Sequence, residues 1–540
     1  MPLHITRSGR GSAFRLHSRA VDEDKVRIAI ELLEEIGADM TSLADLDEEL
    51  RIRLVSAAGQ LSRPDRYTRK ALGKALTRAR FRAKRDADRA ILDQTGIRAL
   101  RREPVFRTPL PKPDMPADVV RDETEVVDPW AAAEARRVDD DASPPLGEGR
   151  ARVELGRMCY VCKAQFNELH HFYDQMCPPC AELNWRKRNQ TADLRGRVAL
   201  VTGGRVKIGY QAAMFLLRAG AEVIVATRFP RDAARRFARE VDASEWTNRL
   251  HVYGIDLRHT PSVELLCQHL AQTQPRLDCL INNACQTVRR PSGWYDHVVT
   301  AENEPYTQLP APERLMLERH RSLGEGLVSA AGNEIHATGL WKSAVLSQVP
   351  LLAEDVERGE HLFPQGRLDQ DLQQVDLRDT NSWRLTLAEV PTAELLEVHL
   401  VNAVAPFVLN AKLRPLLAKV PTRDAHVVNV SAMEGQFYRR WKTDKHPHTN
   451  MAKAALNMMT RTSAIEYVKD GIHMNSVDTG WVTDEDPLHH AERKTRIHGF
   501  HPPLDIVDGA ARIVDPLFDG VNTGNHLWGL FLKDYKPAPW

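Results

Sequence analysis

The stretch VALVTGGRVKIG, Val198–Gly209, decides the fold class of this chain. Its first four residues are apolar and suit a short buried strand, and a glycine-rich turn follows them. The next segment, YQAAMFLLRAG, is typical of a helix, and AEVIVATR is typical of a second strand. In this order the glycines let the backbone approach a pyrophosphate at the helix N-terminus. The pattern predicts a nucleotide-binding α/β domain.

Further apolar segments that end in small polar residues follow at suitable distances: HVYGIDL, LDCLINNAC, LVNAVAPFVLN, AHVVNVSAMEG and GIHMNSVDTGW. This succession resembles the short-chain dehydrogenase/reductase family over about residues 195–540. The resemblance implies an α/β fold with a Rossmann-like doubly wound parallel sheet. The matching positions are Thr202-Gly203 and Ile208-Gly209 in the TGxxxGIG turn, Asp256-Leu257 at the adenine contact, Asn282-Asn283-Ala284 in the NNAG stretch, and Asn402 in the catalytic set.

Charge near the first turn favours NADP over NAD. An NAD site usually has an acidic residue after the second strand, whereas a 2′-phosphate needs a cation there. In this chain Arg228 ends that strand and Arg205 lies in the first turn, and both could pair with phosphate. Lys207 stands where the family has its middle glycine, so it either alters the approach to the pyrophosphate or contacts phosphate itself.

The family's catalytic positions are only partly retained. Lys453 is present and is expected to orient the nicotinamide ribose, but the family's serine position is Ala432, with Ser431 beside it, and the tyrosine of YxxxK is Thr449. An aliphatic hydroxyl is a much weaker acid than a phenol, so Thr449 cannot simply replace tyrosine. His448, whose ordinary pKa is near 6.5, is the first candidate for general acid. His446 and Tyr438 are other candidates, and Thr449 is also suited to cap the helix.

Two functions are consistent with this pattern. The first is an NADP-dependent oxidoreductase that moves hydride to or from a carbonyl or alcohol with a non-standard proton-transfer set, formed by Asn402, Ser431, His448 or Thr449, and Lys453. The second is a catalytically inactive NADP(H)-binding scaffold or sensor. The retained Asn402 and Lys453 favour the enzyme, and the changes at positions 432 and 449 favour the scaffold.

Four of the seven cysteines lie in CYVCKAQFNELHHFYDQMCPPC. Cys159 and Cys162 form one C-x2-C pair, and Cys177 and Cys180 form another. Two such pairs place four thiolates where they close a tetrahedral zinc site, with His170 and His171 as alternative ligands. Four closed ligands leave no position for water, so the predicted zinc is structural.

The rest of the chain divides by composition. Residues 1–103 are predicted to be helical, 104–150 an acidic, Pro-rich linker, 151–194 the zinc module, and 195–540 the nucleotide-binding domain. A large insertion at about 286–394 is expected to be a substrate cover or an interaction platform. Residues 63–89 carry eleven Lys or Arg against three Asp. This segment suits binding of a nucleic acid or an acidic partner, a solvated helix face, or a dock for the acidic linker that follows.

The formal net charge of +1 gives no overall preference for nucleic acid or membrane. We identify no apolar run near the roughly 20 residues of a membrane span and no apolar core of a signal peptide, so we expect a cytoplasmic protein. The expected partner is a small-molecule substrate, and assembly into a homo-oligomer is allowed.

Overall fold

The computed structural model describes residues 22–110, 151–329, 334–357, 359–438 and 442–540 of the chain. It divides into two units, Met1–Asp86 and Ala87–Trp540. Most of the predicted linker, residues 111–150, lies outside the described residues, and the domain boundaries drawn from the sequence stay predictions.

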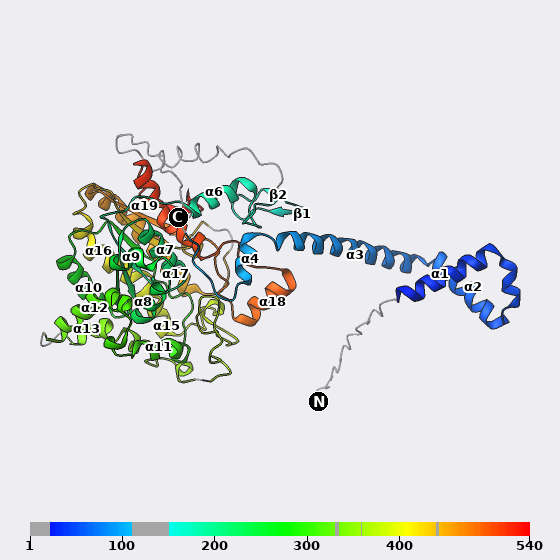
Figure 1. Ribbon diagram of the computed structural model, residues 1–540, viewed down its shortest axis with the longest axis horizontal. Helices are drawn as coiled ribbons and strands as arrows, with labels where there is room; N and C mark the ends of the chain where they lie inside the picture. The colour runs from blue at the N-terminus through cyan, green and yellow to red at the C-terminus, as the bar shows by residue number, and fades with distance from the viewer. Residues whose placement is uncertain (1–21, 111–150, 330–333, 358, 439–441) are drawn as a thin grey trace, which may run out of the picture. The chain divides into compact units, whose positions relative to one another are not determined.

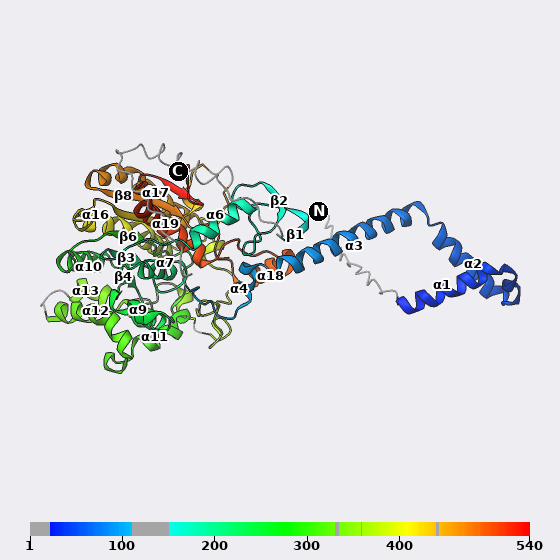
Figure 2. The same cartoon turned by 45° about the horizontal axis from the view of Figure 1, so that its top comes forward.

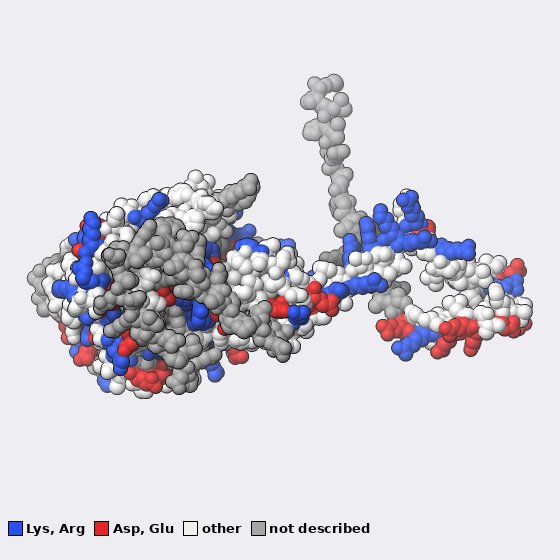
Figure 3. Space-filling model, turned by 90° about the horizontal axis from the view of Figure 1, so that it is seen from above, with Lys and Arg blue, Asp and Glu red and all other residues white. Residues whose placement is uncertain are grey.

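The first unit is helical. It contains α1 (Glu23–Ala38), a 3-10 turn (Met40–Asp45), α2 (Glu48–Ser62) and most of α3 (Arg66–Leu92). Asp22 and Asp47 cap α1 and α2 by accepting hydrogen bonds from backbone N–H groups of the first turn. None of residues 22–86 is buried. Lys and Arg crowd one arm of these helices, and Asp and Glu crowd the other (Figure 3).

The second unit is built on an eight-stranded sheet whose order is β10-β9-β8-β7-β6-β3-β4-β5 (Figures 1 and 2). Neighbouring strands are parallel except β9 and β10, which are antiparallel. The strands are β3 (Val198–Thr202), β4 (Glu222–Thr227), β5 (Leu250–Gly254), β6 (Cys279–Asn282), β7 (Ala425–Ser431), β8 (Ile472–Asp478), β9 (Phe531–Lys533) and β10 (Lys536–Ala538).

Helices cover both faces of this sheet. Alternate residues of β3 belong to two separate hydrophobic cores: Val201 packs with α7 (Lys207–Arg218) and α19 (Ile506–Thr523), and Leu200 packs with α10 (Thr260–Thr273) and α16 (Ala405–Leu417). A strand buried on both sides explains why VALV, residues 198–201, is continuously apolar. The predicted Rossmann-like doubly wound fold is confirmed. The other helices of this part are α8 (Pro230–Ala238), α9 (Ala243–Trp246), α17 (Pro447–Tyr467) and α18 (Leu488–His498).

The predicted insertion forms short helices, of which α12 covers the β5 edge of the sheet. Met316 and Leu317 on α12 share a core with Leu250 and Val252 of β5. An edge strand has unpaired backbone groups, and a covering helix shields them from other chains. The helices are α11 (Asp296–Glu302), α12 (Ala311–Ser329), α13 (Glu334–Trp341), α14 (Ser343–Leu346) and α15 (Thr392–His399).

A small module precedes the sheet. It contains α4 (Gly96–Arg102), the antiparallel pair β1 (Arg152–Met158) and β2 (Gln165–Glu168), and α6 (Pro178–Arg188). Arg188 on α6 joins it to the start of α19, because its guanidinium donates to Asp505 at 2.6 and 2.8 Å and to Asp508 at 2.9 Å. All three side chains are buried, so the module is fixed to the sheet domain.

One helical stretch, Thr392–Leu417, is long and apolar enough to cross a membrane, which our sequence analysis missed. Leu409, Leu413 and Leu416 of this stretch are buried in the core against α10. Length and composition alone are therefore weak evidence for a span, and the predicted location stays a prediction.

Candidate functional site

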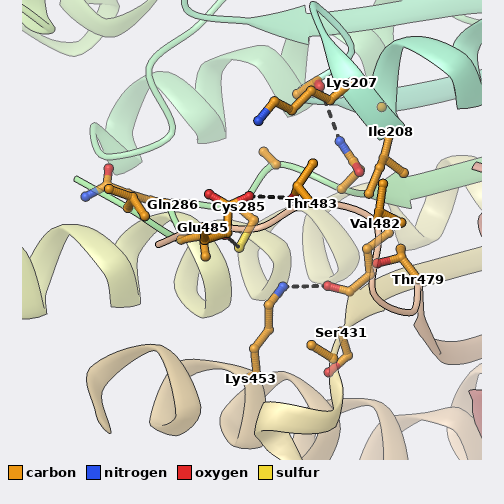
Figure 4. Close-up of a pocket in the computed structure, with 18 of the residues that line it drawn as sticks. Lys207, Ile208, Cys285, Gln286, Ser431, Lys453, Thr479, Val482, Thr483 and Glu485 are labelled. Atoms are coloured by element: carbon orange, nitrogen blue, oxygen red, sulfur yellow. Dashed lines mark hydrogen bonds between the residues drawn. The ribbon is translucent and has the colours of Figure 1, made fainter. Parts of the chain in front are cut away.

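A cavity of about 960 Å³ opens at the carboxyl ends of β3, β4, β6, β7 and β8. This is where open parallel sheets bind their ligands. Lys207 and Lys453 enter it from opposite sides, and Ser431 lies beside Lys453 (Figure 4). Of the predicted site residues, the cavity is lined by Gly203, Arg205, Ile208, Gly209, Arg228, Asp256, Leu257, Asn283, Ala284, Ser431 and Lys453.

The glycine turn has no room for side chains. A Cβ on Gly203 would lie 2.8 Å from Cα of Ala284, and one on Gly209 would lie 2.2 Å from Nδ2 of Asn283. The Thr202 hydroxyl accepts hydrogen bonds from the backbone N–H groups of Asn283 (3.1 Å) and Ala284 (3.0 Å). The ends of β3 and β6 thus form one close-packed floor on which the backbone is accessible to a ligand.

Lys207, the departure from the family's turn, occupies a glycine-like conformation with φ of 55°. Burial lowers its pKa, but the charges of Glu485, Asp371 and Asp369 outweigh this effect, and the pKa lies above its ordinary value. Among the described residues no carboxylate lies within 4 Å of its ammonium group. A charged amine is therefore held above the turn where a pyrophosphate would lie.

The end of the cavity beyond β4 has aromatic and charged walls. Arg228 donates to the Tyr295 hydroxyl at 2.8 Å, and its guanidinium lies 4.9 Å from the centre of that ring. Asp256 is buried and accepts from Arg258 at 2.6 Å. Burial raises the pKa of Asp256, but the hydrogen bonds and charge of Arg258 outweigh it, so the pKa lies below its ordinary value.

Arg205, the other predicted phosphate partner, is already engaged. Its guanidinium donates to Asp232 at 2.6 Å and to Gln373 at 2.5 Å, and the residue is buried. Because the Arg205 guanidinium is buried and hydrogen-bonded, it orders the turn. Arg228 is therefore the cation that is more accessible to a 2′-phosphate.

At the opposite end, the Lys453 ammonium donates to the Val430 carbonyl at 2.7 Å. The Ser431 hydroxyl has no hydrogen-bond partner among the described residues. Asn402 lies in a π turn (Leu400–Val404) that joins α15 to α16, and its amide exchanges hydrogen bonds with the backbone of Gln286 at 2.8 and 3.3 Å. Asn402 therefore positions the loop after β6 instead of lining the cavity.

Besides Asn402, two other predicted catalytic residues do not line the cavity. His448 is buried with its Nε2 atom 3.3 Å from Oε1 of Glu394, which is also buried. Thr449 is buried, but its hydroxyl lies next to Cβ and does not extend to the cavity as a phenol would. The prediction that Thr449 caps the helix is wrong, because α17 starts at Pro447 and His446 is its N-cap residue.

The cavity is also lined by residues that were not predicted from the sequence, among them Tyr160, Lys163, Asp478 and Lys533. Tyr160 lies between the first two cysteines, and its hydroxyl accepts a hydrogen bond from the Trp481 N–H at 2.9 Å. Lys533 has its ammonium 5.4 Å from the Tyr160 ring centre and 3.7 Å from Asp478. Burial is the main reason why the pKa of Asp478 is raised to about 6.

The four clustered cysteines are brought together as predicted. Each offers a sulfur, and the four atoms lie within 4.8 Å of one another. Cys162 and Cys177 have their sulfurs 3.6 Å apart, too far for a disulfide. A tetrahedral zinc with about 2.3 Å bonds separates its sulfurs by about 3.8 Å, so the arrangement fits the metal. His170 instead accepts from the backbone N–H groups of Phe172 and Tyr173.

Comparison with known proteins places this geometry in a family. A short chain dehydrogenase model matches residues 197–299, and an Enoyl-(Acyl carrier protein) reductase model matches residues 380–497. An uncharacterized protein of Acanthamoeba polyphaga mimivirus, R665, is 31% identical over 373 residues, which are 67% of this chain and 71% of that protein. The chain belongs to the short-chain dehydrogenase/reductase family.

Other relatives match smaller parts. Dehydrogenase/reductase SDR family member 13 of Bos taurus is 35% identical over 118 residues, which are 21% of this chain and only 29% of that protein. A solved Pseudomonas aeruginosa RhlG/NADP active-site complex aligns over 63% of this chain and 95% of its own, with 19% identity and a TM-score of 0.38.

Proposed function

We propose that this protein is an NADP-dependent oxidoreductase that transfers hydride to or from a carbonyl or alcohol, with a non-standard proton-transfer set. The observation that carries the proposal is that the glycine turn and Lys453 line one cavity. The turn suits a pyrophosphate, and Lys453 lies where the nicotinamide ribose would be held. Family relatives are named as dehydrogenases and reductases.

Arg228 supports NADP over NAD. Its guanidinium lies at the end of β4, beside Tyr295, and among the described residues no carboxylate lies within 4 Å of it. A 2′-phosphate there would gain a charge-assisted hydrogen bond, whereas a ribose hydroxyl would not need the cation.

For the proton donor we propose Tyr160 in place of the missing tyrosine at position 449. The described tyrosines that line the cavity are Tyr160 and Tyr295. Tyr295 accepts a hydrogen bond from Arg228 at the other end of the cavity. Tyr160 is hydrogen-bonded to Trp481, which follows Asp478 by three residues. Asp478 on β8 pairs in register with Ser431 on β7. Tyr160 is thus the phenol at the Ser431 end.

The hydrogen bonding of Tyr160 suits this role. Its oxygen accepts from the Trp481 N–H, which leaves its own proton for a substrate oxygen. Burial is the main reason why the pKa of Tyr160 is raised, so it is protonated at neutral pH. NADPH held by the glycine turn and Lys453 would supply the hydride for the carbonyl carbon. The Tyr160 phenol would give its proton to the carbonyl oxygen and would regain a proton from solvent.

The test of the oxidoreductase is NADPH oxidation against a panel of aldehydes and ketones, with Lys453→Met as the inactive variant. We expect turnover in the wild type and at least a 100-fold loss in the variant. Tight NADPH binding without turnover of any carbonyl would reject the enzyme. That outcome would favour the alternative, a nucleotide-binding scaffold or sensor, to which the changes at positions 432 and 449 point.

Tyr160→Phe tests the donor, with Tyr295→Phe as its matched control. We expect Tyr160→Phe to lower kcat at least tenfold and to leave NADPH affinity within threefold, and Tyr295→Phe to change NADPH affinity with little effect on kcat. An unchanged kcat and pH profile in Tyr160→Phe would reject the donor while leaving the oxidoreductase intact.

We propose that zinc on Cys159, Cys162, Cys177 and Cys180 is structural, because four thiolates fill its coordination sphere. We further propose that α3 binds a nucleic acid or another polyanion. Its positive charges are exposed and outnumber its carboxylates. Binding of a labelled oligonucleotide should weaken steeply as salt rises, and binding that salt does not affect would reject phosphate contacts.

A further inference from the structure

Three histidines meet at the end of the sheet opposite the cavity. His426 and His473 are the second residues of β7 and β8, and these parallel strands pair them in register. Registered neighbours project to the same face of a sheet. His526 follows α19, which ends at Thr523, and comes to the same place. The three ring centres are 4.9 to 5.3 Å apart.

The ring nitrogens converge. The Nε2 atom of His426 and the Nδ1 atom of His526 are 2.9 Å apart, and one nitrogen from each of the three rings lies within 4.8 Å of the others. Zinc–nitrogen bonds of about 2.0–2.1 Å separate neighbouring ligands by about 3.3 Å in a tetrahedron. Small side-chain rotations would therefore place all three nitrogens around one ion.

His473 also has the outer partner that metal ligands commonly have. Its Nδ1 atom lies 3.3 Å from the Ala425 carbonyl, to which it can donate its proton. A histidine that ligates through one nitrogen usually donates from the other to a carbonyl or carboxylate, which fixes the ring and its tautomer. In His473 this leaves Nε2 as the ligand atom. A hydrogen bond between two neutral imidazoles explains the His426–His526 pair but not the convergence of the third ring.

From this geometry we propose that His426, His473 and His526 bind a divalent transition metal ion of the zinc class. Imidazole is a preferred ligand of such ions. Three protein nitrogens leave a fourth position, and water can reach it because His473 and His526 are only partly buried. The ion would tie the loop before β9 to the starts of β7 and β8.

The experiment counts zinc per chain by mass spectrometry in full-length protein exchanged into chelator-free buffer after zinc loading. We expect two equivalents in the wild type and one in His473→Ala, His526→Ala or Cys159→Ser. His251→Ala is the matched control, because His251 is likewise the second residue of a strand, β5, and lies outside the cluster. It should keep both equivalents. Zinc content in His473→Ala and His526→Ala equal to that of the wild type would overturn the proposal.

Cobalt substitution keeps the test decisive if one variant folds poorly. Cobalt on thiolates absorbs intensely in the near ultraviolet by charge transfer, whereas cobalt on imidazoles shows only weak visible bands. Cobalt-loaded Cys159→Ser should retain the weak bands, and Cys159→Ser combined with His526→Ala should lose them. A Cys159→Ser spectrum without cobalt bands would also overturn the proposal. Neither readout depends on turnover, so the result is separate from the fate of the proposed oxidoreductase.

Discussion

Lys207→Gly should weaken dinucleotide binding while leaving the fold equally or more stable. At φ of 55° a side chain costs roughly 1–2 kcal/mol that glycine avoids, and the greater freedom of glycine in the unfolded chain costs about 0.4–1 kcal/mol. The free energy of unfolding should therefore change by about 0 to +1.6 kcal/mol. A hydrogen bond to a charged group contributes about 1.5–3 kcal/mol, so losing the ammonium should raise the NADPH Kd about 10- to 100-fold.

The chain offers a matched control in Lys163→Gly. Lys163 also has a positive φ, 63°, and lines the same cavity, but its ammonium donates to the Tyr160 carbonyl. It should show a similar stability change with less than a threefold change in Kd. Lys207→Ala separates charge from backbone, since it should lose affinity without gaining stability. Fluorescence titration and denaturant unfolding measure both quantities. Wild-type affinity in Lys207→Gly would refute the phosphate contact.

Three further predictions concern the same cavity. Asp478→Asn should remove part of the pH dependence of stability. The pKa of Asp478 is raised to about 6 in the fold against 3.8 unfolded, so the wild type gains roughly 2 kcal/mol as pH falls from about 7 to 4. Urea unfolding at both pH values should show no such gain from this site in the variant. Cys285 is an exposed thiol on the cavity wall, so iodoacetamide should alkylate it and bound NADPH should protect it. The intact mass of the protein measures the labelling. Equal labelling with and without saturating NADPH would contradict binding of NADPH at this wall. Cys159→Ser should lose one of the two zinc equivalents and lower kcat, with NADPH affinity kept within threefold. Cys267→Ser is the control, because Cys267 is a buried cysteine on α10, and it should keep both equivalents. A loss of affinity equal to the loss of kcat would contradict a role confined to the Tyr160 side of the cavity.

Features encoded by neighbouring residues could be predicted from the sequence. The strand, turn and helix of Val198–Arg218 could be predicted because apolar runs and glycines act on the local backbone. The metal site could be predicted because the two C-x2-C pairs have the spacing of zinc ligands. The close approach of Gly203 to Ala284 is a tertiary contact, but the family motif already contains both positions.

Residues whose role depends on distant packing could not be predicted. The Tyr160–Trp481 hydrogen bond joins positions 321 residues apart, and it depends on how the cysteine module sits on the loop after β8. His448 was predicted to be a proton donor because it neighbours Thr449. It is five residues from Lys453 along α17, so its side chain lies on a different face of the helix, where it contacts Glu394. Adjacency in sequence misled us there, because helical spacing decides which side chains share a cavity.

The cavity therefore has two kinds of wall. Its floor and Lys453 belong to the sheet domain, whereas Tyr160 comes from the cysteine module and Lys533 from the strand that follows His526. The Lys533 ammonium lies over the Tyr160 ring, so these two outer pieces meet at the Ser431 end. Loss of the proposed metal ion at either cluster would loosen an outer wall and leave the glycine turn intact. Turnover should then fall before dinucleotide affinity does, and a chelator titration that follows both quantities would separate these two kinds of wall.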